Sequence, residues 1–483
     1  MRCNRSSRGW GVGLLIFVGA LASSLHAQIG PGKFYLSNRF VGAFESKSRE
    51  RRLNDWLDID YRYAGFTAGL RFELHDPANA ALYNDKITQR YLYYQKDWLQ
   101  IRAGNFYERL GRGLVFHAFE IQSETLDRTS QNIALDRNID GANLKINLEK
   151  FEATAIYGAP LKMLSSERGA ALGGEIRWRP SSTFMLGGAF LRSASEDFRG
   201  AGFHVDMRSA QAGWHGTDFE LYAELAQKRS ANTFSEPDGE ALYASANYAA
   251  GAFGLSAEWK RYEKFRTVFN NPPALVKTHS FTLLNRHTHS LNADDETGYQ
   301  LESYFSPSPG TTVTLHASGA DNLAHSERRR FREYFIESRN EWSARLISRV
   351  LLDYSQDRPV GDVHRWTLAA EADYLSDEKN SVLLDWQFQK IENENSGRYW
   401  NYLGIAAFSR SPWLTLAAQY EHTSKRFAAR RNWLAAIVNV KVGQAHDFYL
   451  TFGSRPAGLV CSGGICFQTP EFQGVELRWN LRY

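Results

Sequence analysis

Two cysteines near the C-terminus have the spacing that most directly predicts a covalent feature. Cys461 and Cys466 are the only cysteines after residue 27, and Gly463-Gly464 between them allows a tight turn. In an oxidising compartment this arrangement favours a small hairpin closed by a disulfide. A redox-active or metal-binding pair and two free thiols are the alternatives.

A histidine-rich segment is the second group of residues that could do chemistry. His287 and His289 would place both rings on one face if the segment were a strand, as a metal site requires. Further polar residues nearby are His279, Asp294, Asp295 and Glu296. No third ligand stands at a characteristic spacing, so we expect a polar loop, with no metal and no other cofactor. We also expect no enzyme, because no G-x-S-x-G or comparable catalytic constellation occurs.

The composition limits the scaffold that can carry these residues. The chain has 483 residues, of which 43% are hydrophobic and 23% charged, as in ordinary folded proteins and unlike disordered ones. A mean hydropathy of -0.44 excludes a bundle of membrane-spanning helices, which needs apolar runs of roughly 18 residues. The single long apolar run lies at the start of the chain.

That run predicts a secretory signal peptide over residues 1–27. Its parts are a basic stretch with Arg2, Arg5 and Arg8, an apolar stretch over 11–22, and a small-residue cleavage site at Leu25-His26-Ala27. An uncleaved membrane anchor is the alternative. Cleavage would leave 54 basic and 53 acidic side chains. Such balance gives no reason to expect nucleic acid as a partner.

The rest of the chain alternates apolar and polar residues with a period of two, which indicates β-strands. One example sets Leu221, Ala223 and Leu225 against Glu220, Tyr222 and Glu224. No stretch after residue 27 sustains a helical period. We therefore predict an all-β protein without a separate helical domain.

The lengths of the connections decide which all-β architecture is expected. About 24 candidate strands (22–26 allowing for miscounts) are joined by short turns that alternate with longer polar connections. This alternation is typical of outer-membrane barrels, whose turns are short at one end and whose loops are long at the other. Because backbone groups in lipid must all be paired, the sheet has to close. We predict one antiparallel transmembrane β-barrel over 28–483, with a secreted soluble β-protein as the alternative.

The end of the chain fits this prediction. The final ELRWNLRY alternates and ends in an aromatic residue, Tyr483. Such an ending is similar to the last-strand signal that the barrel assembly machinery reads. We therefore expect two partners, that machinery during biogenesis and outer-membrane lipid afterwards.

Turning the apolar faces toward lipid sends the charged faces into the lumen. Mixed signs on neighbouring strands predict a hydrated wall with cross-strand ion pairs. The candidate lumen charges are Asp58, Asp60, Glu73, Asp218, Glu220, Glu224, Glu371, Asp373, Arg478 and Arg482.

A lumen of this width is expected to need an internal obstruction. Barrels of 16–18 strands already leave an aqueous channel, and 22-stranded transporters carry a plug. The connections 107–137 and 263–296 combine length with apolar clusters, so we predict that they fold inward and occlude the barrel. Val115, Phe116 and Phe119 would pack against Phe281, Leu283 and Leu284 or against the upper wall. Arg112 would pair with a lumen carboxylate such as Glu73 or Glu152. Mobile surface loops are the alternative.

Three short motifs resemble an uncharacterised family of large outer-membrane β-barrels. They are Leu110-Gly111-Arg112-Gly113-Leu114, Asn138-Ile139-Asp140-Gly141-Ala142, and Gly458-Leu459-Val460-Cys461 continuing to Cys466. The family is found mainly in Bacteroidota and related Gram-negative bacteria. The resemblance implies a signal peptide, a large barrel and no established activity.

Two functions remain open from the sequence. The first is a passive or loop-gated channel for small solutes in the outer membrane of a Gram-negative bacterium. The second is a non-conducting scaffold for protein partners, for example in secretion. Both require the same barrel, so the sequence does not separate them.

Overall fold

A computed structural model describes residues 31–76, 84–122, 134–160, 169–196, 199–277, 279–289, 295–323, 330–462, 465–469 and 471–483. The predicted signal peptide of residues 1–27 lies outside the described residues and stays a prediction. No described helix is long and apolar enough to cross a bilayer.

The described strands form one large sheet and two small ones. The large sheet holds 24 strands. They are β1 (Lys33–Glu45), β2 (Glu50–Tyr63), β3 (Phe66–Asp76), β4 (Asn84–Lys96), β5 (Leu99–Phe106), β9 (Ile139–Asn147), β10 (Phe151–Pro160), β11 (Ala171–Trp178), β12 (Phe184–Glu196), β13 (Gly202–His215), β14 (Phe219–Ser230), β15 (Gly239–Ala250), β16 (Phe253–Glu263), β17 (Asp295–Ser308), β18 (Thr311–Asn322), β19 (Arg330–Ser343), β20 (Leu346–Asp357), β21 (Asp362–Leu375), β22 (Asn380–Asn393), β23 (Gly397–Arg410), β24 (Leu414–Thr423), β25 (Asn432–Val442), β26 (His446–Arg455) and β29 (Phe472–Arg482).

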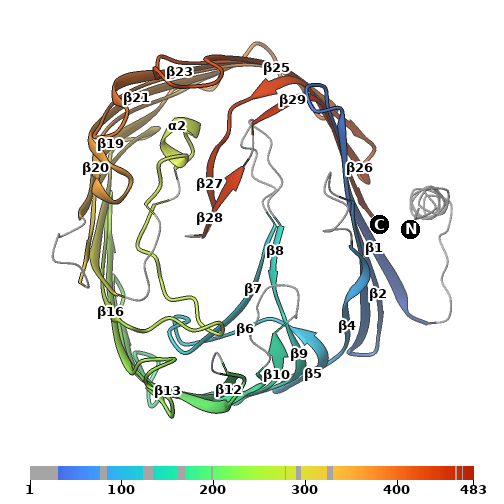
Figure 1. Cartoon of the computed structure of the whole chain (residues 1–483), viewed down its shortest axis with the longest axis vertical. Helices are drawn as coiled ribbons and strands as arrows, with labels where there is room; N and C mark the ends of the chain where they lie inside the picture. The colour runs from blue at the N-terminus through green and yellow to red at the C-terminus, as the bar shows by residue number, and fades with distance from the viewer. Residues whose placement is uncertain are drawn as a thin grey trace.

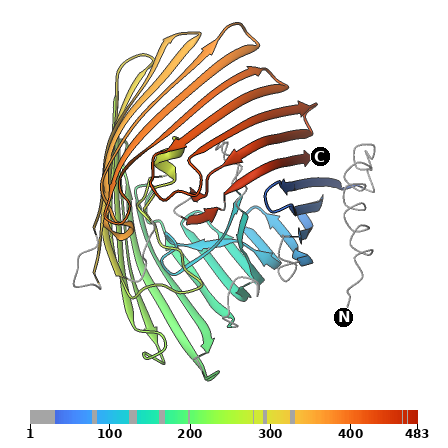
Figure 2. The same ribbon diagram turned by 45° about the horizontal axis from the view of Figure 1, so that its top comes forward.

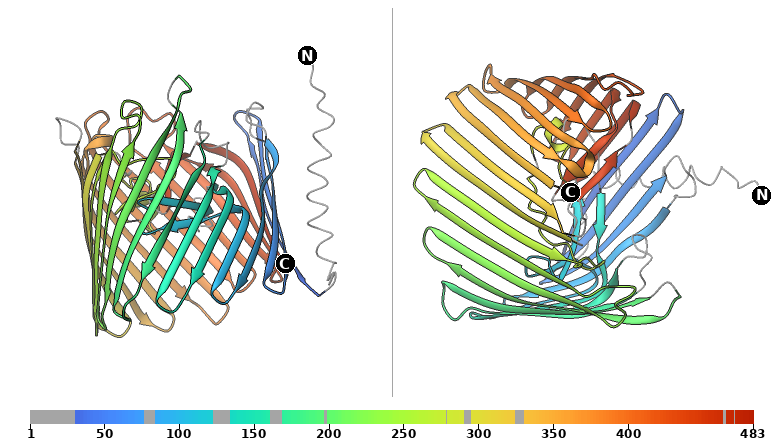
Figure 3. Two further views of the ribbon diagram at one scale, coloured as in Figure 1. Left: turned by 90° about the horizontal axis from the view of Figure 1, so that it is seen from below. Right: turned by 60° about the vertical axis from the view of Figure 1, so that its left-hand side comes forward.

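The large sheet closes into a barrel, because its first and last strands pair. β1 and β29 run antiparallel from Ser37 opposite Arg482 to Glu45 opposite Gly474. All neighbouring strands are antiparallel, and they tilt steeply around the wall (Figure 3). The predicted closed antiparallel barrel of about 24 strands is confirmed.

The period-two alternation separates an apolar outside from a polar inside. Ile176 (62% exposed), Leu384 (55%) and Leu434 (64%) belong to the outward face. The inward face carries buried polar groups such as Glu224 and Arg365, both at 0%. A closed barrel with an apolar outer belt and a polar interior suits a lipid bilayer.

Two details differ from the sequence-based expectation. The alternation of short and long connections is less strict than predicted, because β22 and β23 continue almost to the tip of their hairpin and leave residues 394–396 as the turn. Asp218, expected on the lumen wall, lies instead in the tight turn before β14, where its carbonyl accepts a hydrogen bond from the Ala249 amide.

The remaining elements belong to three segments that lie within the ring of strands (Figure 1). They are β6 (Glu108–Leu110), β7 (Phe116–Gln122) and β8 (Ala134–Arg137), then α2 (Thr282–Asn285), and finally β27 (Gly458–Ser462) with β28 (Ile465–Thr469). A short 3-10 helix, η3 (Arg358–Val360), caps the connection from β20 to β21.

Candidate functional site

The site consists of three chain segments inside the lumen. We call residues 108–122 the inner hairpin, residues 264–289 the strap, and residues 458–469 the terminal hairpin. Each is a connection from the loop end of the barrel that turns inward rather than outward (Figures 1 and 2). The sequence predicted inward folding for the first two segments, and it did not predict it for the third.

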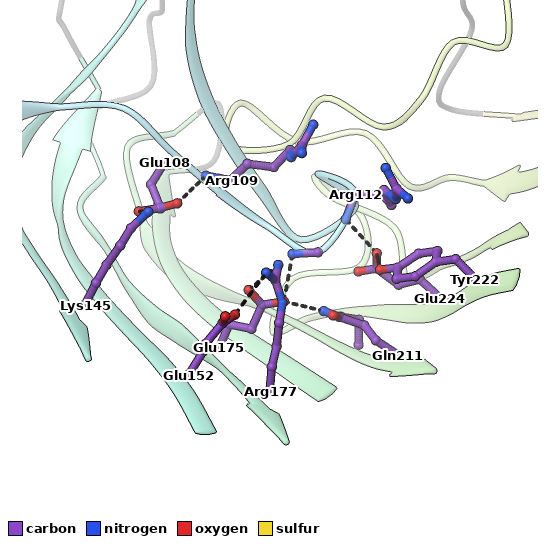
Figure 4. A network of polar contacts seen from close by, with 12 residues as sticks. Glu108, Arg109, Arg112, Lys145, Glu152, Glu175, Arg177, Gln211, Tyr222 and Glu224 are labelled. Atoms are coloured by element: carbon purple, nitrogen blue, oxygen red, sulfur yellow. Dashed lines mark hydrogen bonds and ion pairs between the residues drawn. The ribbon is translucent and has the colours of Figure 1, made fainter. Parts of the chain in front are cut away.

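Two buried carboxylates of the wall hold the turn of the inner hairpin. The Gly111 amide donates a hydrogen bond to Glu175 Oε1 at 2.8 Å, and the Arg112 amide donates one to Glu224 Oε2 at 2.8 Å (Figure 4). Gly111 has a φ of 59°, a conformation that glycine adopts without steric cost. The turn thus presents its backbone donors to two negative charges, and hydrogen bonds to charged groups are the stronger kind.

Arg112 does not make the predicted ion pair with Glu73 or Glu152. Its guanidinium lies 4.8 Å from the centre of the Tyr222 ring, and its contact with a lumen carboxylate is made by the backbone amide. Glu152 instead faces Arg177 and Arg179. The tight turn explains the difference, since it aims the Arg112 amide at Glu224 and leaves the guanidinium over Tyr222.

Further polar contacts fix the sides of the inner hairpin. Glu108 forms an ion pair with Lys145 of β9 at 2.7 Å, and Glu120 forms one with Arg71 of β3. Arg71 also binds Asp58 at 2.6 Å, so one arginine joins the wall and the hairpin. The inner hairpin is therefore anchored on both sides by charged residues.

We expect Gly111→Ala to loosen the inner hairpin. An added Cβ would collide with the Glu224 carboxylate, and a positive φ costs a non-glycine residue roughly 1–2 kcal/mol. Gly397→Ala is the matched control, because Gly397 has a φ of 69° and no atom within 4 Å of an added Cβ. Hydrogen exchange over 108–116 should become faster in Gly111→Ala only. Equal acceleration by both changes would contradict the anchoring role.

The first part of the strap packs against the inner hairpin. The His117 amide donates to the Phe269 carbonyl at 2.8 Å, and Asn270 Nδ2 donates to the Leu114 carbonyl at 3.0 Å. The rings of Phe116 and Phe269 stack at 6.5 Å between centroids. These contacts join two connections that are far apart in the sequence into one body inside the barrel.

The second part of the strap binds two apolar patches on the lumen wall. Phe281 and Leu284 pack on one patch, and Leu283 packs on the other. The first patch consists of Phe335, Leu351 and Ala369, and the second of Leu403 and Ile405. Val115 and Phe116 lie in a different cluster, with Phe265, Phe269 and Leu275 of the strap. Val115 and Phe116 thus pack on the wall and on the first part of the strap, and not on Phe281, Leu283 and Leu284.

Discrete polar contacts hold the strap to five strands of the wall, β16, β19, β20, β22 and β24. Lys260 Nζ donates to the Ala274 carbonyl at 2.6 Å, and the Leu283 amide donates to Gln387 Oε1 at 2.8 Å. The other contacts are His279 with Glu333 at 3.1 Å, Arg349 with the Ser280 hydroxyl at 2.8 Å, and Arg286 with Glu421. Each contact uses a side chain that could otherwise be hydrated in an open lumen.

The histidines at the end of the strap lie in a buried charged cluster and not on a strand. His289 Nε2 lies 3.2 Å from Glu296, its Nδ1 lies 3.7 Å from Asp357, and its ring stacks on Phe331. Burial opposes protonation, but the two carboxylates outweigh it and raise the pKa of His289 to about 9. Burial and the nearby Arg365 lower the pKa of His287 well below its usual value.

The other predicted lumen charges lie on the inward register face of their strands. They are Asp58, Asp60, Glu73, Glu220, Glu224, Glu371, Asp373, Arg478 and Arg482. Glu371 of β21 binds Arg349 of the adjacent strand β20 at 3.0 Å. Arg478 binds Glu476 of its own strand at 3.0 Å. Phe119 of β7 is half-buried, under the Arg137 guanidinium at 5.5 Å. Whether these residues occlude the pore stays a prediction.

Sequence reasoning missed the wall residues that receive the strap. Phe335, Leu351, Leu403 and Ile405 occupy positions where the alternation predicts polar, lumen-facing side chains. A signal was present, because the alternation fails there and both faces are apolar, as in Val350-Leu351-Leu352 and 402–408. Apolar residues on both faces of a barrel strand indicate that something covers the inner face.

The backbone of the terminal hairpin places Cys461 opposite Cys466. The side chains of 459–470 lie outside the described residues, so the disulfide stays a prediction. We expect no thiol to be alkylated in unreduced, denatured protein. In Cys461→Ala the 454–471 connection should become more sensitive to protease while barrel stability barely changes, since closing a short loop removes little unfolded-chain entropy. Two alkylated thiols would contradict the pairing.

Several solved structures of outer-membrane proteins align with most of the chain at low identity. The P pilus usher PapC translocation pore aligns over 93% of this chain and 99% of that chain, with a TM-score of 0.49 and 9% identity. The siderophore receptor PirA from Pseudomonas aeruginosa aligns over 93% and 80%, with a TM-score of 0.47 and 7% identity. OccK5 (OpdH) from Pseudomonas aeruginosa aligns over 81% and 98%, with a TM-score of 0.39 and 11% identity. These values describe a general likeness of barrels and nothing finer.

A search of the curated proteins finds no match. The model of one protein family covers nearly the whole chain, from residue 24 to residue 483. The chain therefore belongs to the family of unknown function DUF6029.

Proposed function

We propose that the protein is a channel for small solutes in the outer membrane of a Gram-negative bacterium, and that the strap and the inner hairpin gate its lumen. The apolar outer face and the closed ladder support the membrane location. The charged inner face supports a hydrated path, because charges on a lumen wall are solvated when nothing covers them.

The observation that carries this proposal is how the strap is attached. It is held by separate hydrogen bonds and ion pairs and by two small apolar patches, and it contributes no strand to the barrel. Below it the ladder is intact, since β16 and β17 pair from Phe253–Phe305 up to Glu263–Asp295. The strap can therefore leave the wall without opening the barrel.

Single-channel recording of the purified protein in planar bilayers tests the proposal. We expect steady conductance interrupted by discrete changes of current as the inner segments move. A silent protein that co-purifies with a defined partner would overturn the channel and favour the scaffold.

A further inference from the structure

A cavity of about 680 Å³ lies at the loop end of the lumen, between the inner hairpin, the start of the strap and the wall. Its size is within the range that proteins use for small organic ligands. The cavity opens where the strap leaves β16, on the side from which a solute outside the cell would arrive. It is separate from the patches that hold the second part of the strap.

The lining of the cavity carries more positive than negative charge. The cations are Arg137, Lys228, Lys264 and Arg266, and the carboxylates are Glu236 and Asp295. The charge of Lys228 is balanced by an ion pair, because its Nζ lies 2.6 Å from the Glu236 carboxylate. The three remaining cations face the single carboxylate of Asp295, so the cavity favours an anion.

Arg137 and Arg266 both line the cavity, and the charge of Arg266 acts on Arg137. Burial, and next the positive charge of Arg266, lower the pKa of Arg137 below its usual value. Arginine forms paired hydrogen bonds with carboxylates and phosphates, and an oxyanion between these two guanidinium groups would relieve their repulsion.

Part of the cavity lining is apolar. Phe116 (1% exposed) and Phe269 (4%) are covered by their neighbours. Val268 and Pro160, by contrast, are half-buried and Pro237 is exposed, so these three residues offer the accessible apolar surface. Such a surface adds affinity for an apolar group in proportion to the area that leaves water. A bare inorganic ion would leave this surface uncovered.

We propose that this cavity binds a small solute that carries one oxyanion, a carboxylate or a phosphate, on an apolar body. The oxyanion lies between Arg137 and Arg266, and the apolar body lies on Val268, Pro160 and Pro237. The role of the solute as cargo rests on the proposed channel, whereas its binding does not. Passage would follow when the strap, which contributes Arg266 and Val268, moves away from the wall.

The test is calorimetric titration of the full-length mature protein in phosphatidylcholine nanodiscs. Phenyl phosphate should bind, and inorganic phosphate and benzyl alcohol should each bind at least about tenfold more weakly, the equivalent of one charge-assisted hydrogen bond. Equal binding of inorganic phosphate would overturn the apolar part of the proposal, and equal binding of benzyl alcohol would overturn the anionic part.

Substitutions then test the two arginines. Arg266→Gln and Arg137→Gln should each weaken phenyl phosphate binding at least about tenfold. Arg261→Gln is the control, because Arg261 is exposed, lies next to Lys260 on the other face of β16, and pairs with Glu263. Heat-modifiable mobility in electrophoresis identifies folded barrels, and if Arg137→Gln does not fold, Arg266→Gln decides.

Unchanged affinity in folded Arg266→Gln, or no binding to the folded wild type, would overturn the site. Conductance measured on the same preparations separates this failure from failure of the channel. Binding without conductance would overturn only the channel, and conductance without binding would overturn only the site.

Discussion

Replacing residues 267–287 by a short Gly/Ser linker is expected to leave the barrel folded and to raise its single-channel conductance several-fold. The wall does not need the strap, because Glu263 and Asp295 already face each other in the β16–β17 ladder and a short linker can join them. A barrel of 24 strands is wider than those that already leave an aqueous channel. Removing the strap should also increase the sensitivity of cells to large antibiotics.

The control for this deletion is a loop change that does not touch the lumen. Residues 426–429 form an exposed tip between β24 and β25, where Phe427 is 81% exposed. Replacing them with Gly and Ser should leave conductance unchanged. If the strap deletion also changed nothing, the terminal hairpin or a bound partner would have to close the pore, and the scaffold would become the better hypothesis.

The barrel was predictable from the sequence because its rules are local. Successive side chains of a strand point alternately to lipid and to the lumen, and the length of each connection can be counted in the sequence. In Phe219–Ser230, for example, Leu221 and Leu225 face outward and Glu224 faces inward, as the pattern predicts. Closure followed from the need to pair every backbone group in lipid.

The contacts inside the lumen were not predictable, because they depend on partners far away in the sequence. Leu283 binds Gln387, which is 104 residues later, and Gly111 binds Glu175, which is 64 residues later. A one-residue shift of any strand between them would change which side chain each meets. Length and apolar clusters indicated that the segments turn inward, and only the register shows where they bind.

The charged cluster at the end of the strap leads to a second large effect, a dependence of gating on pH with an optimum. When the strap is docked, His289 is protonated up to about pH 9, because Glu296 lies within hydrogen-bond distance of its ring and the Asp357 carboxylate lies 3.7 Å away. When the strap is released, an ordinary histidine loses its proton near pH 6.5. Docking therefore gains its full contribution from His289 below about pH 6.5 and loses it as the pH rises through about 9.

His287 has the opposite effect on the acidic side. Its pKa is lowered in the docked strap by burial and by Arg365, so the docked form keeps it neutral. Below about pH 6.5 the released form takes up a proton that the docked form refuses, and docking weakens as the pH falls. His279 acts in the same direction as His289, because Glu333 outweighs burial and raises its pKa.

The strap should consequently dock most firmly slightly below neutral pH, and the open fraction of the channel should rise on both sides of that optimum. One proton changes the ratio of open to docked channels by up to about tenfold per pH unit. His289→Gln should reduce the alkaline rise, of which His279 keeps a part, and leave the acidic rise. His287→Gln should reduce the acidic rise and leave the alkaline rise. Each variant is thus the control for the other when conductance is recorded as a function of pH. An identical pH profile in wild type and both variants would mean that other lumen charges, and not the strap, set the response.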